Sequence, residues 1–216
     1  MFFLSTLEES IRLEPKDLDK PRADAISLVI EELFVDKIVQ DLGLVVTLYD
    51  IVSIASGFVH HSDGGPRFQV VFRVVVFRPF AGEVIVGKIK RVSRAGLHVS
   101  LGFFDDVIIP EHYLQEESMF DEAEQLWFWK YVGEDGQENK LYMELDEDIR
   151  FKSKAVRFQA IPTPEELRKA REKDPLIGTA EKPLALMEVI GEVYSEGLGP
   201  VAWWMDDDEE NEQMPS

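Results

Sequence analysis

Hydrophobic positions in the first 80 residues change their spacing along the chain, and each spacing predicts a different element. Residues 2–13 are typical of a strand, after which apolar residues recur at helical spacing until Gly43, where we expect the helix to end. The apolar helical positions are Ile26, Ile30, Leu33 and Ile38. Residues 44–51 form a nearly unbroken apolar run that predicts a strand buried on both faces. Residues 67–77 alternate, so their apolar face is expected to pack on the helix. Together these elements predict a small β-α-β-β domain.

From Ala81 onward the pattern consists of short strands separated by turns, which favours a small barrel. Val84 and Val86 begin an alternation that Ile89 resumes out of phase, so we expect a β-bulge at Gly87. Further strands are predicted at 97–101, 107–109, 149–158 and 184–194. Five strands is the number in an OB-fold. The predicted fold class is therefore α+β, with a truncated RNA-recognition-like domain followed by an OB-fold barrel.

Two segments exceed what a minimal barrel needs and are interpreted as insertions, near 122–145 and 162–183. The second insertion begins with Thr163-Pro164-Glu165-Glu166, a capping-box pattern that predicts a short surface helix. The domains are accordingly expected at 1–80 and 81–205. An acidic tail, expected to be disordered, occupies 206–216.

Composition limits the classes of function. The chain has no cysteine and a formal net charge of -19, which excludes disulfides and thiolate metal sites and makes any nucleic-acid contact local. No stretch approaches the roughly 20 apolar residues that cross a bilayer, and no leader pattern opens the chain. We therefore expect a soluble intracellular protein without membrane contact.

The sequence carries no recognisable catalytic motif, such as a phosphate-binding loop, a nucleophile elbow or a zinc-protease signature. His60, His61 and Asp63 form a cluster, but adjacent strand residues point to opposite faces and rarely share one metal ion. Asp105 and Asp106 diverge for the same reason. We expect no catalytic residue, no metal and no cofactor.

A local excess of cations in the first barrel strand and its turn predicts a surface for single-stranded RNA, because an OB-fold combines cations with flat rings that stack on bases. The RNA-binding candidates are Lys88, Lys90, Arg91, Arg94, His98, Phe103 and Phe104. An alternative is that one of the two phenylalanines plugs the barrel and the cations are ordinary surface residues. Arg150, Lys152 and Lys154 either extend the cationic track or mark a solvent face.

The aromatic residues of the first insertion exceed what a minimal barrel buries. Trp127, Trp129 and Tyr131 share one face of a predicted strand and are candidates for partner binding, with packing inside the insertion as the alternative. Residues 201–204, which end in Trp203-Trp204, are expected to close against the chain's own domains.

Several segments together resemble one protein family. Residues 75–84 (VVFRPFAGEV) are similar to the domain boundary of eukaryotic and archaeal RNA polymerase stalk subunits. Residues 87–90 (GKIK), 96–110 (GLHVSLGFFDDVIIP) and 120–127 (FDEAEQLW) resemble the RNA polymerase III members, as do the closing glycines and Trp203-Trp204. The second insertion and the tail are least like the family.

The resemblance implies a non-catalytic nuclear subunit that supports transcription initiation. Its partners would be the RNA polymerase III core, a smaller stalk subunit in an obligate heterodimer, initiation factors and single-stranded RNA. The core-docking loop would comprise Gly57, Phe58, His60, Gly64, Gly65 and Arg67. Alternatives are a stalk subunit of RNA polymerase II, a free OB-fold RNA-binding factor of translation or RNA decay, and an undetected hydrolase.

Overall fold

The structure is a computed structural model that describes residues 1–59, 64–132, 138–160, 162–173 and 185–204. It divides into two compact units, Met1–Pro79 with Ala160–Gly178 and Phe80–Gln159 with Thr179–Ser216. We describe each unit by itself. The sequence pattern predicts a domain boundary between residues 80 and 81 and places the second insertion in the barrel domain.

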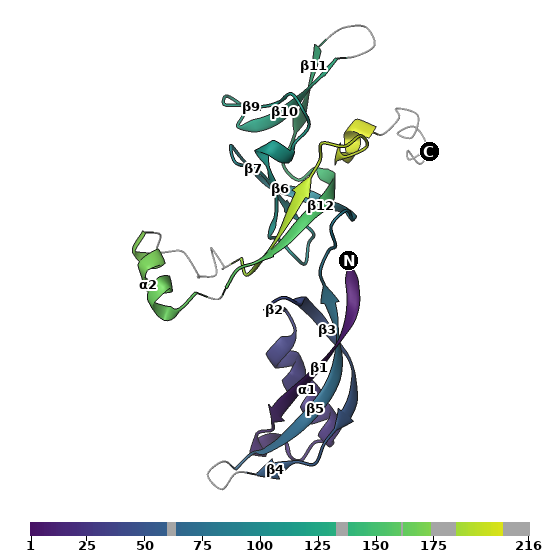
Figure 1. Cartoon of the computed structure of the whole chain (residues 1–216), viewed down its shortest axis with the longest axis vertical. Coiled ribbons are helices and arrows are strands. Elements are labelled where there is room, and N and C mark those ends of the chain that lie inside the picture. Colours follow the sequence, from purple (N-terminus) through teal and green to yellow (C-terminus); the bar gives the residue numbers. More distant parts are fainter. Residues whose placement is uncertain (60–63, 133–137, 161, 174–184, 205–216) are drawn as a thin grey trace, which may run out of the picture. The chain divides into compact units, whose positions relative to one another are not determined.

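The first unit is a sheet with a helix on one face (Figure 1). Its strand order is β1-β5-β3-β2, and β4 pairs with β5. The elements are β1 (Phe2–Arg12), η1 (Pro15–Asp17), α1 (Arg22–Phe34), β2 (Lys37–Val39), β3 (Gly43–Ile54), β4 (Phe58–Val59) and β5 (Pro66–Phe77). Alternate residues of β5 from Phe68 to Val76 are buried against Ala25, Ile26 and Ile30 of α1, which confirms the predicted packing face.

Two predictions for this unit are wrong. The helix ends at Phe34 and not at Gly43, because Val35 is extended and Asp36 has a positive φ of 58°, which turns the chain into β2. Ile38 consequently lies on β2. Strand β3 is not buried on both faces, since α1 packs on one face and Tyr49 is 58% exposed on the strand.

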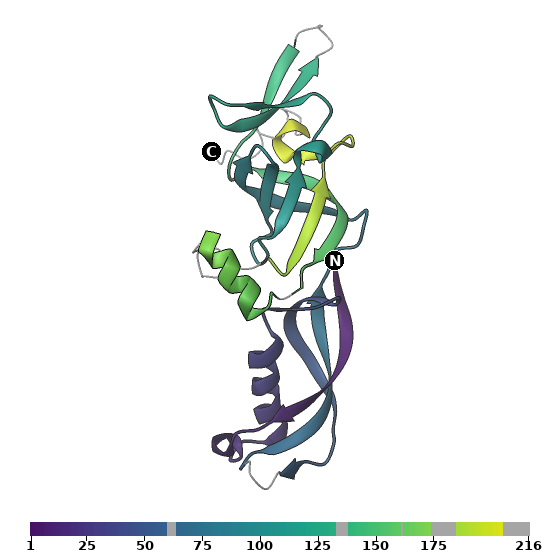
Figure 2. The same cartoon turned by 60° about the vertical axis from the view of Figure 1, so that its left-hand side comes forward.

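The second unit contains a closed five-stranded barrel that fits an OB-fold (Figure 2). The barrel strands are β6 (Val84–Ser93), β7 (Gly96–Ser100), β8 (Val107–Pro110), β12 (Asp148–Phe158) and β13 (Met187–Glu192). β6, β7 and β8 form an antiparallel run, β13 pairs parallel to β8, and β12 closes the barrel between β13 and β6. β14 (Gly199–Pro200) also pairs with β12, and η3 (Val201–Trp204) follows it.

The predicted bulge at Gly87 is wrong. Ile85, Gly87 and Ile89 all face the barrel interior in one phase, and the register shift lies between Ile89 and Arg91. Gly87 is needed for a different reason. A Cβ at this position would lie 2.6 Å from Val99 Cγ1 and 2.8 Å from the carbonyl oxygen of Ser100, so only glycine lets β7 approach this closely.

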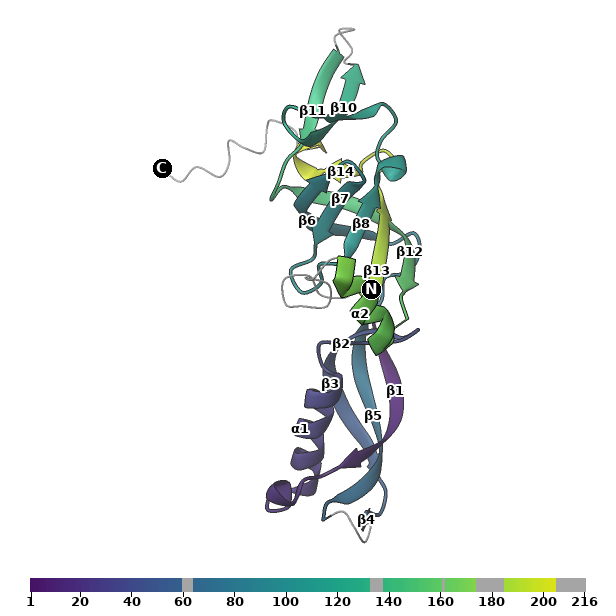
Figure 3. The ribbon, with the colours of Figure 1, turned by 90° about the vertical axis from the view of Figure 1, so that its left-hand side faces the viewer.

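The first insertion is a three-stranded sheet of its own, with order β11-β10-β9 (Figure 3). The segment contains η2 (Glu111–Tyr113), β9 (Ser118–Asp121), β10 (Leu126–Val132) and β11 (Glu138–Met143). The second insertion contains the expected helix, α2 (Pro164–Lys173). Its capping box forms as predicted, because the Thr163 amide donates to Glu166 Oε2 at 2.8 Å and the Glu166 amide donates to Thr163 Oγ1 at 3.3 Å.

Candidate nucleic-acid interface

The cations of β6 project from the outer face of the barrel. The inward phase of Ile85 to Ile89 leaves Lys88 exposed, and the register shift after Ile89 exposes both Lys90 and Arg91. Lys88 lies opposite Ser100 of β7, and Arg91 lies opposite His98. Four of the predicted RNA-binding residues are thereby brought together on two neighbouring strands.

Strand β12 extends this cationic face on the other side of β6. Asp148, Arg150 and Lys152 alternate outward on β12 and lie opposite Lys88, Val86 and Val84 in the register. Arg150 and Lys152 thus share the outward face of the strand next to β6, and the Arg150 guanidinium also donates to the carbonyl oxygen of Gly197 at 3.3 Å. We call the set Lys88, Lys90, Arg91, Arg150 and Lys152 the cationic track. Lys154 lies farther along β12 and instead pairs with the buried Glu192 at 2.9 Å.

Carboxylates that sequence reasoning missed pair with the track. Lys90 donates to Asp105, and Lys88 lies 3.5 Å from Asp148. The hydrogen bond from Lys90, and after it the one from Ser100, lowers the pKa of Asp105, which therefore stays ionised. Both lysine side chains remain at least 60% exposed. Ion pairs this exposed contribute only about 0–1 kcal/mol, so phosphate oxygens can replace the carboxylates at little cost.

His98 contributes a flat ring rather than a charge. Its Nε2 lies 2.9 Å from Arg91 Nη2, an arrangement in which the guanidinium donates to the neutral imidazole. Burial, and after it the positive charge of Arg91, lowers the pKa of His98, so the ring is neutral near pH 7. The contact orients Arg91 on the outer face of the barrel.

The two adjacent phenylalanines separate into different roles. Phe103 is 50% exposed, whereas Phe104 is only 5% exposed. Burial removes Phe104 from the stacking candidates, since a base cannot reach its ring, and it matches the alternative in which one phenylalanine plugs the barrel. Phe103 lies two residues before Asp105, the partner of Lys90, in the loop between β7 and β8.

Arg94, another predicted RNA-binding residue, pairs with a carboxylate of the first insertion. It lies in the turn between β6 and β7 and donates to Glu122, in the turn between β9 and β10. Its guanidinium therefore ties the insertion to the barrel turn.

The tip of the first unit carries the predicted docking loop. Phe58 and Val59 of β4 are 51% and 59% exposed and pair with Arg67 and Pro66 at the start of β5. Gly57 fits against the Phe68 ring, where a Cβ would lie 2.3 Å from its Cε1. Gly64 is exposed and Gly65 is buried. His60 lies outside the described residues, together with His61 and Asp63.

The aromatic residues of β10 differ in accessibility. Trp127 is 7% exposed, and its Nε1 donates to the carbonyl oxygen of Ser93 at 2.8 Å, so it packs within the chain. Tyr131 is 42% exposed, and Trp129 stacks on Trp203 with ring centroids 5.6 Å apart. The contact with Trp203 shows that residues 201–204 close on the chain's own second unit, as expected.

The described residues lack the features of a metal site and of a membrane-spanning helix. They contain no group of three or more His, Cys, Asp or Glu side chains that could hold a metal ion. None of their helices is both long and apolar enough to cross a bilayer.

Comparisons with known proteins match both units. A family model described as "RNA polymerase III subunit Rpc25" matches residues 83–204, and one described as "SHS2 domain found in N terminus of Rpb7p/Rpc25p/MJ0397" matches residues 8–64. The DNA-directed RNA polymerase III subunit rpc8 of Schizosaccharomyces pombe is 37% identical over 206 residues, covering 94% of this chain and 100% of that protein.

Two further relatives extend this similarity across eukaryotes. The RNA polymerase III subunit RPC8 of Bos taurus is 37% identical and covers 94% of this chain and 98% of its own length. The Saccharomyces cerevisiae RPC8 is 32% identical, with 94% and 100% covered. The chain therefore belongs to the family of RNA polymerase III stalk subunits that combine an SHS2 domain with an OB-fold.

Proposed function

We propose that the chain is a non-catalytic, nuclear stalk subunit that docks on the RNA polymerase III core and presents its barrel to single-stranded nascent RNA. The observation that carries the RNA role is the cationic track, which joins β6 and β12 on the outer face of a barrel in a chain with a net charge of -19. A local cationic face on an acidic protein restricts RNA to one surface.

The chemistry of the track suits a single strand better than a duplex. Exposed Val84 and Val86 lie between the cations, and Phe103 and His98 supply rings beside them. Lysine and arginine side chains can follow a phosphate backbone while unpaired bases stack on the rings, each stack contributing about 1 to 3 kcal/mol. Neither the phosphate contacts nor the stacking distinguishes one base from another, so we expect weak preference for RNA sequence.

Replacing Lys88, Lys90 and Arg91 with alanine is expected to weaken binding of a 12-nucleotide oligouridine. Single strands contribute about 0.7 to the salt slope for each phosphate contact, so losing three contacts lowers the slope of log K against log salt concentration by about 2. Fluorescence anisotropy across a salt series, with the full chain in complex with its smaller stalk partner, measures both quantities.

Two further variants test whether the position of the cations, and not only the net charge, determines binding. Alanine at Lys16, Lys20 and Lys37 changes the charge equally on the first unit and should leave binding nearly unchanged. Asp105→Asn frees Lys90 from its carboxylate and should strengthen binding about 2- to 5-fold. Equal loss in both triple variants, or no gain with Asp105→Asn, would show that RNA does not use the track.

Docking on the core is assigned to the tip of the first unit. Phe58 and Val59 are apolar, adjacent and more than half exposed at the end of a hairpin. Aromatic and aliphatic side chains of this kind act as anchors when a partner buries them.

The double variant Phe58→Asp with Val59→Asp is expected to weaken association with the polymerase core about 30-fold or more, because two apolar anchors become buried charges. Pull-down of core subunits by the tagged stalk pair measures the loss. Leu28→Asp with Leu33→Asp on α1 is the matched control, since these leucines are 50% and 48% exposed. Equal retention of the core by both double variants would place docking elsewhere.

The remaining partners belong to the same proposal. We assign Trp129 and Tyr131 to contact with a partner protein, because both stay accessible while Trp127 does not. A smaller stalk subunit forms an obligate heterodimer with this chain, and initiation factors contact the pair. The match to an RNA polymerase III family model favours this reading over an RNA polymerase II stalk subunit or a free OB-fold factor.

A further inference from the structure

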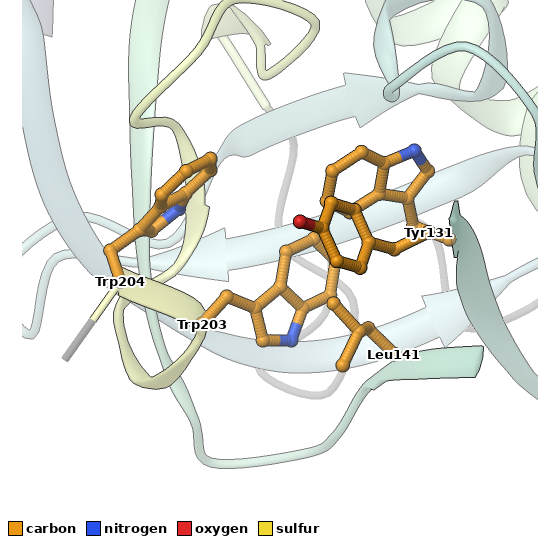
Figure 4. Close-up of a pocket in the computed structure, with 5 residues that line it drawn as sticks. Tyr131, Leu141, Trp203 and Trp204 are labelled. Carbon is orange, nitrogen blue, oxygen red and sulfur yellow. The ribbon is translucent and has the colours of Figure 1, made fainter. Parts of the chain in front are cut away.

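An aromatic pocket lies between the first insertion and the end of the second unit. It has a volume of ≈ 190 Å³ and is lined by Trp129, Tyr131, Leu141, Trp203 and Trp204. Figure 4 shows Trp203 and Trp204 extending from η3, with Tyr131 and Leu141 approaching from the hairpin of β10 and β11. The volume is below the usual range for drug-sized ligands, so the pocket suits a single side chain.

The rings are held in place before any ligand binds. Trp129 stacks on Trp203 at an interplanar angle of 26°, and Tyr131 packs on Trp129 with ring centroids 5.4 Å apart. The Trp204 Nε1 donates to the carbonyl oxygen of Leu198 at 3.0 Å, which fixes the fourth ring. A preorganised pocket loses little side-chain entropy on binding.

Its electrostatics favour a cation. Ring faces carry negative charge density, and Tyr131 and Trp204 remain 42% and 39% exposed. The sequence continues from Trp204 to six acidic residues, namely Asp206, Asp207, Asp208, Glu209, Glu210 and Glu212. The chain's net charge of -19 repels phosphate groups, whereas the ring faces attract a cation.

We propose that the aromatic pocket binds an arginine side chain from a basic segment of a protein partner. Arginine fits better than lysine because its planar, weakly hydrated guanidinium stacks on aromatic faces. The pocket shares no residue with the cationic track.

A fluorescent peptide with three arginines separated by Gly-Ser provides the probe, measured by anisotropy with the full chain in complex with its smaller stalk partner. A second peptide carries citrulline, which keeps the shape of arginine without its charge, and a third carries lysine. We expect the citrulline peptide to bind about 10-fold or more weakly than the arginine peptide, and the lysine peptide to fall between them.

Variants locate the site. Tyr131→Ala and Trp204→Leu are each expected to weaken binding of the arginine peptide about 3- to 30-fold. Met119→Ala is the matched control, because Met119 is 52% exposed on the same three-stranded sheet outside the pocket. Replacing the six acids of the tail by their amides should weaken binding and flatten its salt dependence.

Fluorine NMR of 5-fluorotryptophan protein keeps the test decisive if a variant misfolds. Resonances of Trp129, Trp203 and Trp204 should shift on adding the arginine peptide, while that of buried Trp127 should not. Equal binding of the citrulline peptide would overturn the proposal in favour of an uncharged groove. Displacement of the peptide by equimolar oligouridine would identify a base-stacking site instead, and unmoved pocket resonances would place binding elsewhere.

Discussion

Replacing Gly87 with valine is expected to destabilise the barrel by about 3 kcal/mol or more. A Cβ at this position would lie 2.6 Å from Val99 Cγ1 and 2.8 Å from the Ser100 carbonyl oxygen, and backbone cannot move aside as a flexible side chain can. β7 must therefore separate from β6, or β6 must change register. Either response opens the closed barrel at the strand that carries Lys88 and Lys90.

Urea unfolding followed by tryptophan fluorescence measures this loss without interference from the first unit. All four tryptophans, Trp127, Trp129, Trp203 and Trp204, belong to the second unit. Val86→Ala is the control on the same strand, because Val86 is 52% exposed and should change the midpoint little. An unchanged midpoint for Gly87→Val would mean that Gly87 does not face the interior.

The error about β6 shows where hydrophobic patterning fails. The predicted alternation starts from Val84 and Val86, which places Ile89 out of phase, yet both valines are exposed opposite Lys152 and Arg150. The true inward set is Ile85, Gly87 and Ile89, and glycine has no side chain to signal its phase. In β5 every second residue from Phe68 to Val76 faces inward, and each of these is large and apolar, so the same reasoning succeeds there.

The candidate site was predictable in its cations but not in their partners. Lys88, Lys90 and Arg91 are adjacent in sequence, so one strand brings them together. Their carboxylate partners come from other parts of the barrel: Asp148 pairs with Lys88 from the neighbouring strand β12, and Asp105 pairs with Lys90 from the loop between β7 and β8. Adjacent Phe103 and Phe104 differ only in orientation, which composition does not encode. The aromatic pocket likewise joins Trp129 of β10 to Trp203 of η3, which lie more than 70 residues apart in the sequence.

Truncation of Trp127 to alanine is expected to destabilise the second unit by about 3–5 kcal/mol, the range for deleting a buried aromatic side chain. Trp127 is 7% exposed, packs edge-on against Phe120 with centroids 5.5 Å apart, and donates its indole N–H to the Ser93 carbonyl oxygen. It thus links the three-stranded sheet to the turn that joins β6 and β7. Fluorescence of the three remaining tryptophans during urea unfolding measures the loss.

Two further variants separate this internal role from partner binding. Trp127→Phe keeps most of the buried surface but removes the hydrogen bond to Ser93, so it should cost about 1–2 kcal/mol. Tyr131→Ala, at an exposed position on the same strand, should change stability by less than about 1 kcal/mol and act on partner contacts instead. If Tyr131→Ala destabilised the unit as much as Trp127→Ala, the exposed rings of β10 would be part of the folding core and their assignment to a partner would fail.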